Sequence, residues 1–270
     1  MPELPEVETT RRGIAPHLIG ARITALVVRQ PRLRWPVAPE LAGLLPGSVI
    51  ERVSRRAKYL LLGIDLGDVL VHLGMSGSLR IVDVHTQPGT HDHVDLVMEN
   101  GTALRFHDPR RFGCWLWQAR ETAHPLLAAL GPEPLSTAFD NDHLWRVSRG
   151  RSAPVKAFLM DQRVVVGVGN IYAAEALFRA GIHPARAAGR VSRERYRVLS
   201  DAVRAVLAHA IERGGTTLRD YVNASGEPGF FELELSAYGR GGEPCRRCAT
   251  PLKHAVIGQR ASVWCPRCQR

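Results

Sequence analysis

The chain has 270 residues, 45% hydrophobic content and a formal net charge of +10. This length exceeds one typical hydrophobic core, so two domains are expected. No apolar run approaches the ~18 residues of a membrane span, which argues against a membrane partner. The N-terminus is acidic and lacks the apolar segment of a secretion signal, so we expect a cytoplasmic protein.

Positive charge is concentrated in the second half of the chain. Residues 143–214 carry 13 basic and 5 acidic side chains, and residues 239–270 carry 7 and 1. Arginine accounts for 33 of the 36 Lys and Arg residues, and its planar guanidinium suits bidentate contacts with phosphate. A clustered excess of this kind is what a nucleic-acid backbone requires. A basic surface that only confers solubility is the alternative interpretation.

The chain opens with MPELPEVET, and this stretch allows two interpretations. Pro5 and the acidic residues around it are ordinary start signals of a helix. If Met1 is removed, the chain instead begins with the secondary amine of Pro2, close to the positive end of that helix. An α-amino group titrates near pH ~7.7 to 8, within reach of neutrality. The terminal amine is therefore a candidate nucleophile, with the Glu3 carboxyl group one residue away.

The first predicted element is a helix that starts at Pro5, has one apolar stripe and is closed by Gly20. Short β-rich runs then continue to about residue 117, and we expect strands at residues 23–28, 49–53, 59–64, 69–73 and 78–82. Residues 93–98 and 102–106 form a hairpin through Asn100-Gly101, a signal for a type I′ turn. Many short antiparallel strands with one helix predict a β-sandwich.

The periodicity becomes helical after a linker with Gly and Pro at residues 131–136. Helices are expected at residues 142–147, 153–161, 171–180 and 192–212. Between two of them, VVVGVGN at residues 164–170 is a glycine-bearing turn before a helix N-terminus. The amides of such a terminus can bind phosphate, and Asn170 can add a side-chain donor. A tight turn between helices explains the glycines about as well.

The C-terminal segment carries two Cys-x2-Cys pairs that are 16 residues apart: Cys245, Cys248, Cys265 and Cys268. Four thiolates in two close pairs can hold one Zn²⁺ tetrahedrally, and disulfides are the weaker alternative in a cytoplasmic chain. Four protein ligands leave no open coordination position, so we expect a structural metal. The only Lys or Arg residues between the pairs are Lys253 and Arg260. Cys114 is left over and is expected to be buried.

Seven blocks of sequence together resemble those of the bacterial formamidopyrimidine-DNA glycosylases. They are PELPEVET at residues 2–9, RAKYL at 56–60, HLGMSG at 72–77, HDH at 91–93, DPRRFG at 108–113, VGVGNIY at 166–172 and the four-cysteine segment. The similarity runs end to end, and ordered agreement over seven blocks is more specific than any single block. It favours the nucleophile over the plain helix start at Pro2.

The resemblance implies an α+β multidomain fold. The expected domains are an N-terminal catalytic β-sandwich led by the catalytic helix at residues 1–131, a linker at 132–142, a helix-two-turns-helix DNA-binding domain at 143–235 and a zinc finger at 236–270. The implied cofactor is one structural Zn²⁺. The implied partner is damaged double-stranded DNA, bound by a monomer that associates with the nucleoid.

The implied activity is that of a bifunctional base-excision repair enzyme, which removes 8-oxoguanine and formamidopyrimidines and then cleaves the strand by β,δ-elimination. By this resemblance, Pro2 attacks C1′ of the damaged nucleotide and forms a Schiff base. Glu3 donates a proton that helps to open the sugar, and Lys58 is the general acid/base of β-elimination. Arg260 corresponds to the finger residue that binds phosphate and takes part in δ-elimination.

The resemblance also assigns two groups of DNA-binding residues. The first fills the space left by the extruded nucleotide and wedges the opposite strand, and it consists of Met75, Arg110 and Phe112. The second contacts the DNA backbone and consists of His91, Arg151 and Asn170. Residues 214–229 correspond to a loop that covers the extruded base.

Two alternatives compete with this interpretation. The related endonuclease VIII branch shares the terminal Pro-Glu and prefers oxidised pyrimidines, but Leu4 and the wedge group favour the formamidopyrimidine branch. A non-enzymatic zinc-ribbon DNA-binding protein would keep the basic half and the cysteines, without needing Pro2, Glu3 and Lys58 together. The preferred lesion and the opposite-base preference do not follow from the sequence.

Overall fold

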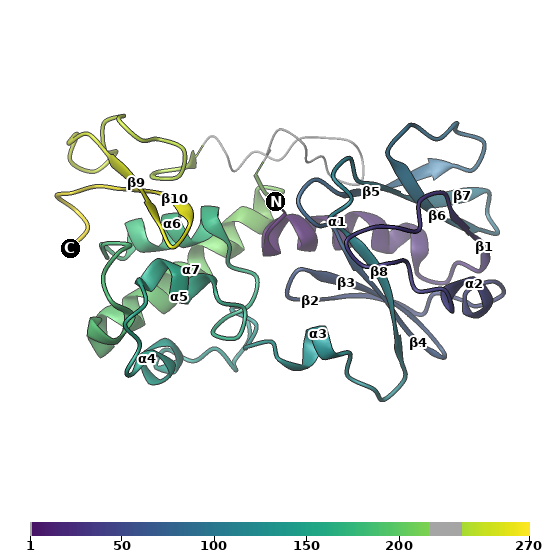
Figure 1. The fold of residues 1–270 in the computed structure, drawn as a ribbon, viewed down its shortest axis with the longest axis horizontal. Coiled ribbons are helices and arrows are strands. Elements are labelled where there is room, and N and C mark those ends of the chain that lie inside the picture. Colours follow the sequence, from purple (N-terminus) through teal and green to yellow (C-terminus); the bar gives the residue numbers. More distant parts are fainter. Residues whose placement is uncertain (1, 217–233) are drawn as a thin grey trace. The chain divides into compact units, whose positions relative to one another are not determined.

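The computed structural model describes residues 2–216 and 234–270 (Figure 1). The chain divides into two compact units, Met1–Ala128 with Arg213–Phe230 and Ala129–Glu212 with Phe231–Arg270. The finer boundaries at residues 131, 142 and 235 stay a prediction, and most of the expected loop at 214–229 lies outside the described residues. In the part of the chain that is described, no helix is both long and apolar enough to cross a membrane.

The first unit begins with helix α1 (Leu4–Leu18), one residue earlier than expected. Its predicted apolar stripe is confirmed, because Leu4, Val7, Ile14 and Leu18 are at most 1% exposed. Gly20 follows the helix with a φ of 83°, a left-handed conformation that glycine adopts without strain. The helix packs on strands of both sheets of this unit, so its N-terminal end has a fixed place on the sandwich.

The predicted β-sandwich is confirmed as two four-stranded antiparallel sheets (Figure 1). The first sheet has the order β1 (Ile23–Val28), β6 (Asp92–Met98), β7 (Thr102–His107) and β5 (Ser78–Asp83). The second has the order β2 (Arg52–Arg56), β3 (Tyr59–Ile64), β4 (Gly67–His72) and β8 (Cys114–Ala119). Short helices α2 (Leu41–Leu44) and α3 (Pro125–Ala128) lie in the connections. One core of apolar side chains joins α1 to both sheets.

Three details of the sandwich differ from expectation. The strand expected at 49–53 is β2, Arg52–Arg56, because pairing with β3 sets its bounds, while Val49 only bridges Arg22. Strand β8 was not expected as a separate element. The hairpin between β6 and β7 has a three-residue loop in which Gly101 alone has a positive φ, 80°. The predicted type I′ turn is therefore wrong, since that turn needs two residues with positive φ.

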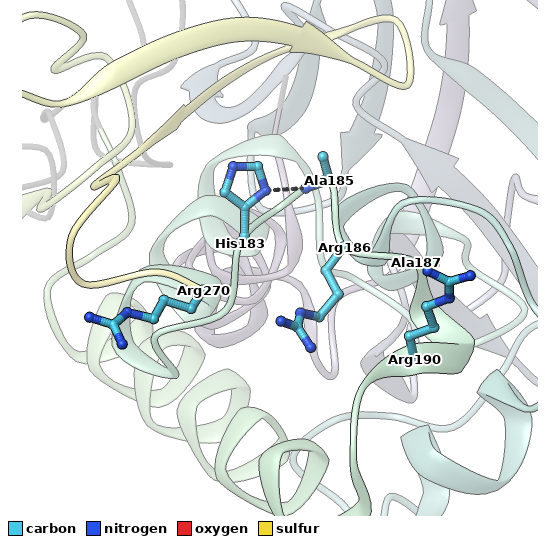
Figure 2. Close-up of a pocket in the computed structure, with 6 residues that line it drawn as sticks. All are labelled: His183, Ala185, Arg186, Ala187, Arg190 and Arg270. Atoms are coloured by element: carbon cyan, nitrogen blue, oxygen red, sulfur yellow. Dashed lines mark hydrogen bonds between the residues drawn. The ribbon is translucent and has the colours of Figure 1, made fainter.

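The second unit contains the four predicted helices, with bounds that differ by one or two residues: α4 (His143–Ser148), α5 (Val155–Met160), α6 (Asn170–Arg179) and α7 (Arg193–Glu212). A short 3-10 helix, η1 (Ala188–Arg190), precedes α7. Strands β9 (Lys253–Ile257) and β10 (Arg260–Trp264) pair as a hairpin that packs on α6. A cavity of about 710 Å³ lies beside η1 and is lined partly by arginines (Figure 2).

Candidate functional site

The start of α1 is fixed by one buried carboxylate. Pro2 is buried, Glu3 is 2% exposed and Glu6 is fully buried. One oxygen of Glu6 accepts a hydrogen bond from the Glu3 amide at 2.8 Å, the reciprocal bond of a capping box. The other oxygen accepts from the amide and the hydroxyl of Thr216, at 2.9 and 3.0 Å. Glu6 thus ties the beginning of the chain to a residue 210 positions later.

A second carboxylate on α1 connects the helix to strand β2. Glu8 accepts hydrogen bonds from Arg11 at 2.9 Å, from Arg12 at 2.9 Å and from Arg55 at 3.2 Å. Burial opposes its ionisation, but the hydrogen bonds from Arg11 and Arg12, and then the charges of Arg11 and Arg55, lower the pKa of Glu8 to about 2. Arg55 also donates to the carbonyl of Ala57 at 2.8 Å. This ion cluster therefore holds the turn that carries Lys58.

Lys58 occupies the turn between β2 and β3 and is 8% exposed. The residue before it, Ala57, has a φ of 54°, a conformation that a non-glycine residue adopts at some energetic cost. Burial, and then the charge of Lys58, lowers the pKa of His72 to about 4. Neutral His72 accepts a hydrogen bond at Nδ1 from the Gly74 amide at 2.9 Å. Lys58 is thus a buried cation whose field reaches the turn after β4.

Asp108 holds three loops of the first unit together. It is fully buried; its carboxylate accepts from the Ser76 hydroxyl at 2.9 Å and from the Gly113 amide at 2.8 Å. Its carbonyl accepts from His93 Nε2 at 2.8 Å, and its amide donates to the carbonyl of His91 at 3.0 Å. These loops contain every first-unit residue that the sequence assigns to DNA binding. Asp108 belongs to the DPRRFG block of the resemblance, but the sequence did not indicate that it connects these three loops.

The structure brings the predicted wedge residues onto two packed loops. A Cβ at Gly74 would lie 2.4 Å from the carbonyl carbon of Phe112, so the turn that carries Met75 rests on that backbone. The Arg110 guanidinium lies 4.9 Å from the centroid of the Phe112 ring, in a cation–π contact. Phe112 is 41% exposed and Met75 is half-buried. An aromatic ring held outside the core in this way is available to a partner.

His91 is exposed beside the same junction. Its ring lies 6.3 Å from that of His93 and 5.9 Å from that of His107, edge to face in both cases. Among the residues that the structure describes, only the four finger cysteines form a group of three or more side chains that could hold a metal. His91 and His93 are therefore not part of a possible metal site within the described residues.

In the second unit, Asn170 is the first residue of α6, as the glycine-bearing turn indicated. The turn is held by Gln162, which accepts from the Gly167 amide at 2.8 Å and donates to the Val168 carbonyl at 3.2 Å. The Asn170 side-chain oxygen is buried and has no hydrogen-bond partner among the described residues. Arg151 is exposed, and its backbone is fixed by bonds to the 3-10 region. Both residues belong to this unit, separate from Pro2 and Lys58.

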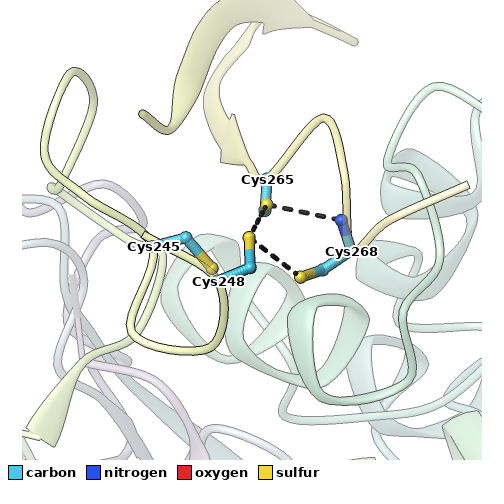
Figure 3. Close-up of side chains that lie close together, drawn as sticks. All are labelled: Cys245, Cys248, Cys265 and Cys268. Carbon is cyan, nitrogen blue, oxygen red and sulfur yellow. Dashed lines mark hydrogen bonds between the residues drawn. The ribbon is translucent and has the colours of Figure 1, made fainter. Parts of the chain in front are cut away.

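The four cysteine sulfurs lie within 4.8 Å of one another (Figure 3). Cys245 and Cys265 are buried, whereas Cys248 and Cys268 are half-buried. Amides point at two of the sulfurs: Arg247 N lies 3.4 Å from Cys245 Sγ, and Cys268 N lies 3.3 Å from Cys265 Sγ. Such donors stabilise thiolates, and the arrangement fits one tetrahedral Zn²⁺ with a structural role.

Two buried charges on the helices anchor the finger. Lys156 on α5 is 1% exposed, and its ammonium donates to the Ala261 carbonyl and the Ser262 hydroxyl, both at 2.8 Å. These residues follow Arg260, which is exposed at the start of β10. Glu175 on α6 accepts from three successive amides, those of residues 236–238, at 2.8 to 2.9 Å. The hairpin that presents Arg260 is therefore rigidly mounted on the helices.

Comparisons with known proteins agree with this arrangement of elements. The formamidopyrimidine-DNA glycosylase N-terminal domain matches residues 1–115, the H2TH domain of the same glycosylases matches 130–222, and the zinc finger found in FPG and IleRS matches 242–270. The chain belongs to the formamidopyrimidine-DNA glycosylase family.

Individual members of the family are similar along the whole chain. The formamidopyrimidine-DNA glycosylase of Stenotrophomonas maltophilia K279a is 63% identical, and the alignment covers 100% of both chains. The MutM (FPG) protein of Thermus thermophilus has a TM-score of 0.88 at 42% identity, over 99% of this chain and 98% of that one. A Lactococcus lactis FPG mutant in complex with DNA containing Fapy-dG has a TM-score of 0.93 at 32% identity, with both chains fully covered.

Within this family fold, Glu6, Asp108, Lys156 and Glu175 are the supporting residues that sequence reasoning missed. The spacing of Glu3 and Glu6 is a capping-box signal that could have revealed the first. The other three look like ordinary charged residues, because their partners lie far away in the sequence. Cys114 is 3% exposed, as expected, and burial raises the pKa of its thiol to about 12.

Proposed function

We propose that this protein excises oxidised purines, 8-oxoguanine and formamidopyrimidines, from double-stranded DNA and then cleaves the strand at the resulting site. It is a base-excision repair glycosylase and lyase of the formamidopyrimidine-DNA glycosylase family. The observation that carries the assignment of the nucleophile is the fixed start of α1, where buried Pro2 and Glu3 precede a capping box closed by Glu6. The substrate class is supported by the relative bound to DNA containing Fapy-dG.

The proposed chemistry begins at the amine of Pro2 after Met1 has been removed. The nitrogen forms a bond to C1′ of the damaged nucleotide, and the bond from C1′ to the base breaks. Glu3 follows Pro2 in the sequence, and its side chain is buried. It donates the proton that helps to open the sugar. Because Pro2 is a secondary amine, the resulting iminium is cationic, and it acidifies the proton on C2′.

Strand cleavage then follows by two eliminations. Loss of the C2′ proton expels the 3′ phosphate, and a second elimination expels the 5′ phosphate. Lys58, which is 8% exposed in the turn between β2 and β3, is the proposed general acid/base of the first step. Arg260 is the proposed phosphate ligand of the second, a role that suits an exposed guanidinium on a rigid hairpin.

DNA binding is proposed to use residues from both units. Extrusion of the damaged nucleotide costs a few kcal/mol of unstacking. The space that it leaves is filled by Met75, Arg110 and Phe112. The backbone is contacted by His91, Arg151 and Asn170, and the last has an unpartnered buried oxygen at a helix N-terminus within the described chain. The zinc, when bound, cross-links the finger that presents Arg260. We propose that the enzyme acts as a monomer on cytoplasmic, nucleoid-associated DNA.

Borohydride trapping tests this function directly. Reduction of the iminium should give a covalent complex between Met-free protein and a duplex containing 8-oxoguanine. Pro2→Gly should lose most of the trapped product, because the primary amine of glycine gives a less electrophilic imine. The same protein with Met1 retained is the matched control and should trap none. Absence of an adduct with Met-free wild-type protein would contradict the proposed function.

A panel of lesions separates the two branches of the family. Faster trapping with 8-oxoguanine and formamidopyrimidine duplexes than with oxidised pyrimidines supports the assignment. The opposite order would place the enzyme with the endonuclease VIII branch. Binding to every duplex without trapping would indicate a non-enzymatic DNA-binding protein.

A further inference from the structure

The cavity beside η1 carries a concentration of positive charge that none of the assigned residues explains. It has a volume of about 710 Å³ and lies wholly in the second unit (Figure 2). Its lining consists of His183, Ala185, Arg186, Ala187, Arg190 and Arg270. Among the residues that the structure describes, no Asp or Glu lines this cavity, so its three arginine side chains share one wall without a described acidic neighbour.

The three arginines, Arg186, Arg190 and Arg270, are here called the arginine row. Over residues 2–216 and 234–270, none of their side chains forms a salt bridge or donates a hydrogen bond. Elsewhere in the unit the pattern is different, since Arg193 and Arg197 share the carboxylate of Asp142. Unpaired cations around a cavity create a positive potential that attracts anions.

The backbone that carries the arginine row is held in place. Arg270 donates its amide to the Gly181 carbonyl at 2.9 Å, and its own carbonyl accepts from the His183 amide at 3.3 Å and from the Arg195 guanidinium at 2.8 Å. The Arg186 carbonyl accepts from the amide of Val155 at 2.7 Å. Only side chains therefore need to move when a ligand binds, which lowers the entropic cost of binding.

His183 gives the cavity a defined neutral donor. Its Nδ1 accepts from the Ala185 amide at 3.2 Å, so its proton resides on Nε2 (Figure 2). Its ring lies 4.9 Å from that of Trp264, edge to face. Burial, and then the charge of Arg186, lowers the pKa of His183, and the same two causes lower the pKa of Arg195. Both groups therefore lie within reach of the Arg186 charge.

The shape of the arginine row matches a chain of phosphates better than a single ion. Arg186 lies between Arg270 and Arg190, and the three side chains spread along the cavity instead of converging on one point (Figure 2). Ala185 and Ala187 add apolar contacts to the lining. Alternating charged and apolar contacts are what the phosphates and sugars of a nucleic-acid strand require.

The arginine row is also distinct from the finger residue assigned to the reaction. Trp264, which packs on His183, ends strand β10, whereas Arg260 begins it. Four steps along a strand span roughly 13 Å. Trp264, at the other end of the strand from Arg260, is therefore the β10 residue that lies against His183 of the cavity.

We propose that the arginine row is a second DNA-backbone site, which binds phosphates of undamaged DNA independently of sequence and of the lesion. It rests on the proposed function only in taking DNA as the partner. Such a site would retain the enzyme on DNA between lesions, because non-specific affinity comes almost entirely from phosphate contacts.

The test is the salt dependence of binding to an undamaged duplex. Each phosphate contact contributes about 0.9 to the slope of log K against log salt concentration. The triple variant R186Q/R190Q/R270Q should therefore lower the slope by about 2 to 3. The control R22Q/R32Q/R120Q removes the same charge from exposed arginines of the first unit and should lower it by less than about 1. Thermal unfolding checks that both variants fold.

Two results would overturn the proposal: a slope unchanged by R186Q/R190Q/R270Q, or an equal change in the control. A second arm observes the guanidinium NMR signals of the wild-type protein during titration with the undamaged duplex or with inorganic phosphate. Shifts of the row with the duplex at stoichiometric concentrations support a DNA site. Shifts with inorganic phosphate alone would overturn it in favour of a small phosphorylated ligand. Trapping on a lesion duplex is scored separately, so failure of the repair function leaves this test intact.

Discussion

The start of α1 and the four-cysteine finger are both short, chemically specialised segments, but different interactions stabilise their structures. The start of α1 is buried, and the hydrogen bonds of Glu6 fix it against the sandwich. Strand β9 of the finger is almost entirely exposed, and the finger's own buried cluster amounts to a few side chains around Cys245 and Cys265. The first region thus depends on the fold of its whole unit, and the second on a metal. It should be possible to disrupt either one alone.

Removal of the metal is the largest expected perturbation. Zinc binding supplies about 10 kcal/mol or more of folding free energy in isolated fingers. Chelation, or Cys248→Ser, should abolish amide-exchange protection in residues 245–268 and weaken DNA binding strongly. Protection of α1 should persist, and Cys114→Ala, which alters a cysteine outside the finger, should keep its full metal content. Parallel loss of protection in α1 would show that the two regions are not independent.

The substitution Glu6→Gln perturbs the start of α1 instead of the finger. The side-chain amide of Gln can accept at its oxygen only, so either the Glu3 amide or the Thr216 amide loses its acceptor in a buried setting. We expect a loss of about 1 to 3 kcal/mol in unfolding free energy. Borohydride trapping should slow, while the finger keeps its zinc. The exposed Glu40→Gln is the control in urea unfolding, and equal stability of the two variants would count against the role given to Glu6.

Glu8 predicts how the first unit responds to acid. Its folded pKa of about 2 lies below the ordinary value of 4.5, so its ionised form stabilises the fold above pH 4.5. That contribution is lost as the pH falls from 4.5 toward 2. The full shift corresponds to about 3 kcal/mol, and solvent around the half-exposed Arg12 reduces it to about 1 to 2. Glu8→Gln should show this loss at pH 7 and flatten the acid limb of urea unfolding; the control is Glu51→Gln.

Arg260→Ala is the smallest perturbation of stability. The side chain is exposed, so unfolding free energy should change by less than about 0.5 kcal/mol. The salt slope of DNA binding should fall by about 0.9, the value for one phosphate contact. Lys253→Ala, on the paired strand of the same hairpin, is the matched control. An identical change in both variants would mean that the hairpin contributes only general charge.

Local patterns in the sequence were sufficient for much of the fold. The stripe of α1, most of the strands and the paired cysteines each depend on neighbouring residues, and each was predicted. The turn at Gly101 was predicted wrongly because its type depends on how β6 and β7 align, with Val97 opposite Ala103. A pattern within four residues does not contain that alignment.

The functional residues likewise divide into those that local sequence suggested and those whose role depends on residues far away in the chain. The chemistry of a terminal amine suggested Pro2, but Lys58 and the wedge residues were assigned only through the resemblance, and their roles stay predictions. Asp108 and Lys156 could not be recognised, since the value of a buried charge depends on partners such as Ser76 and Ala261. Those partners become neighbours only in the folded chain.

The bond between Glu6 and Thr216 also sets an order of events during synthesis. The first turn of α1 leaves the ribosome early, but its buried partner is made 210 residues later. At about 5 to 20 residues per second, roughly 10 to 40 s pass before Thr216 is translated. During that interval the first turn of α1 lacks the partner that holds Glu6, so the beginning of the nascent chain is accessible. The removal of Met1 that the proposed chemistry requires is therefore expected to take place before Thr216 closes over the start of α1.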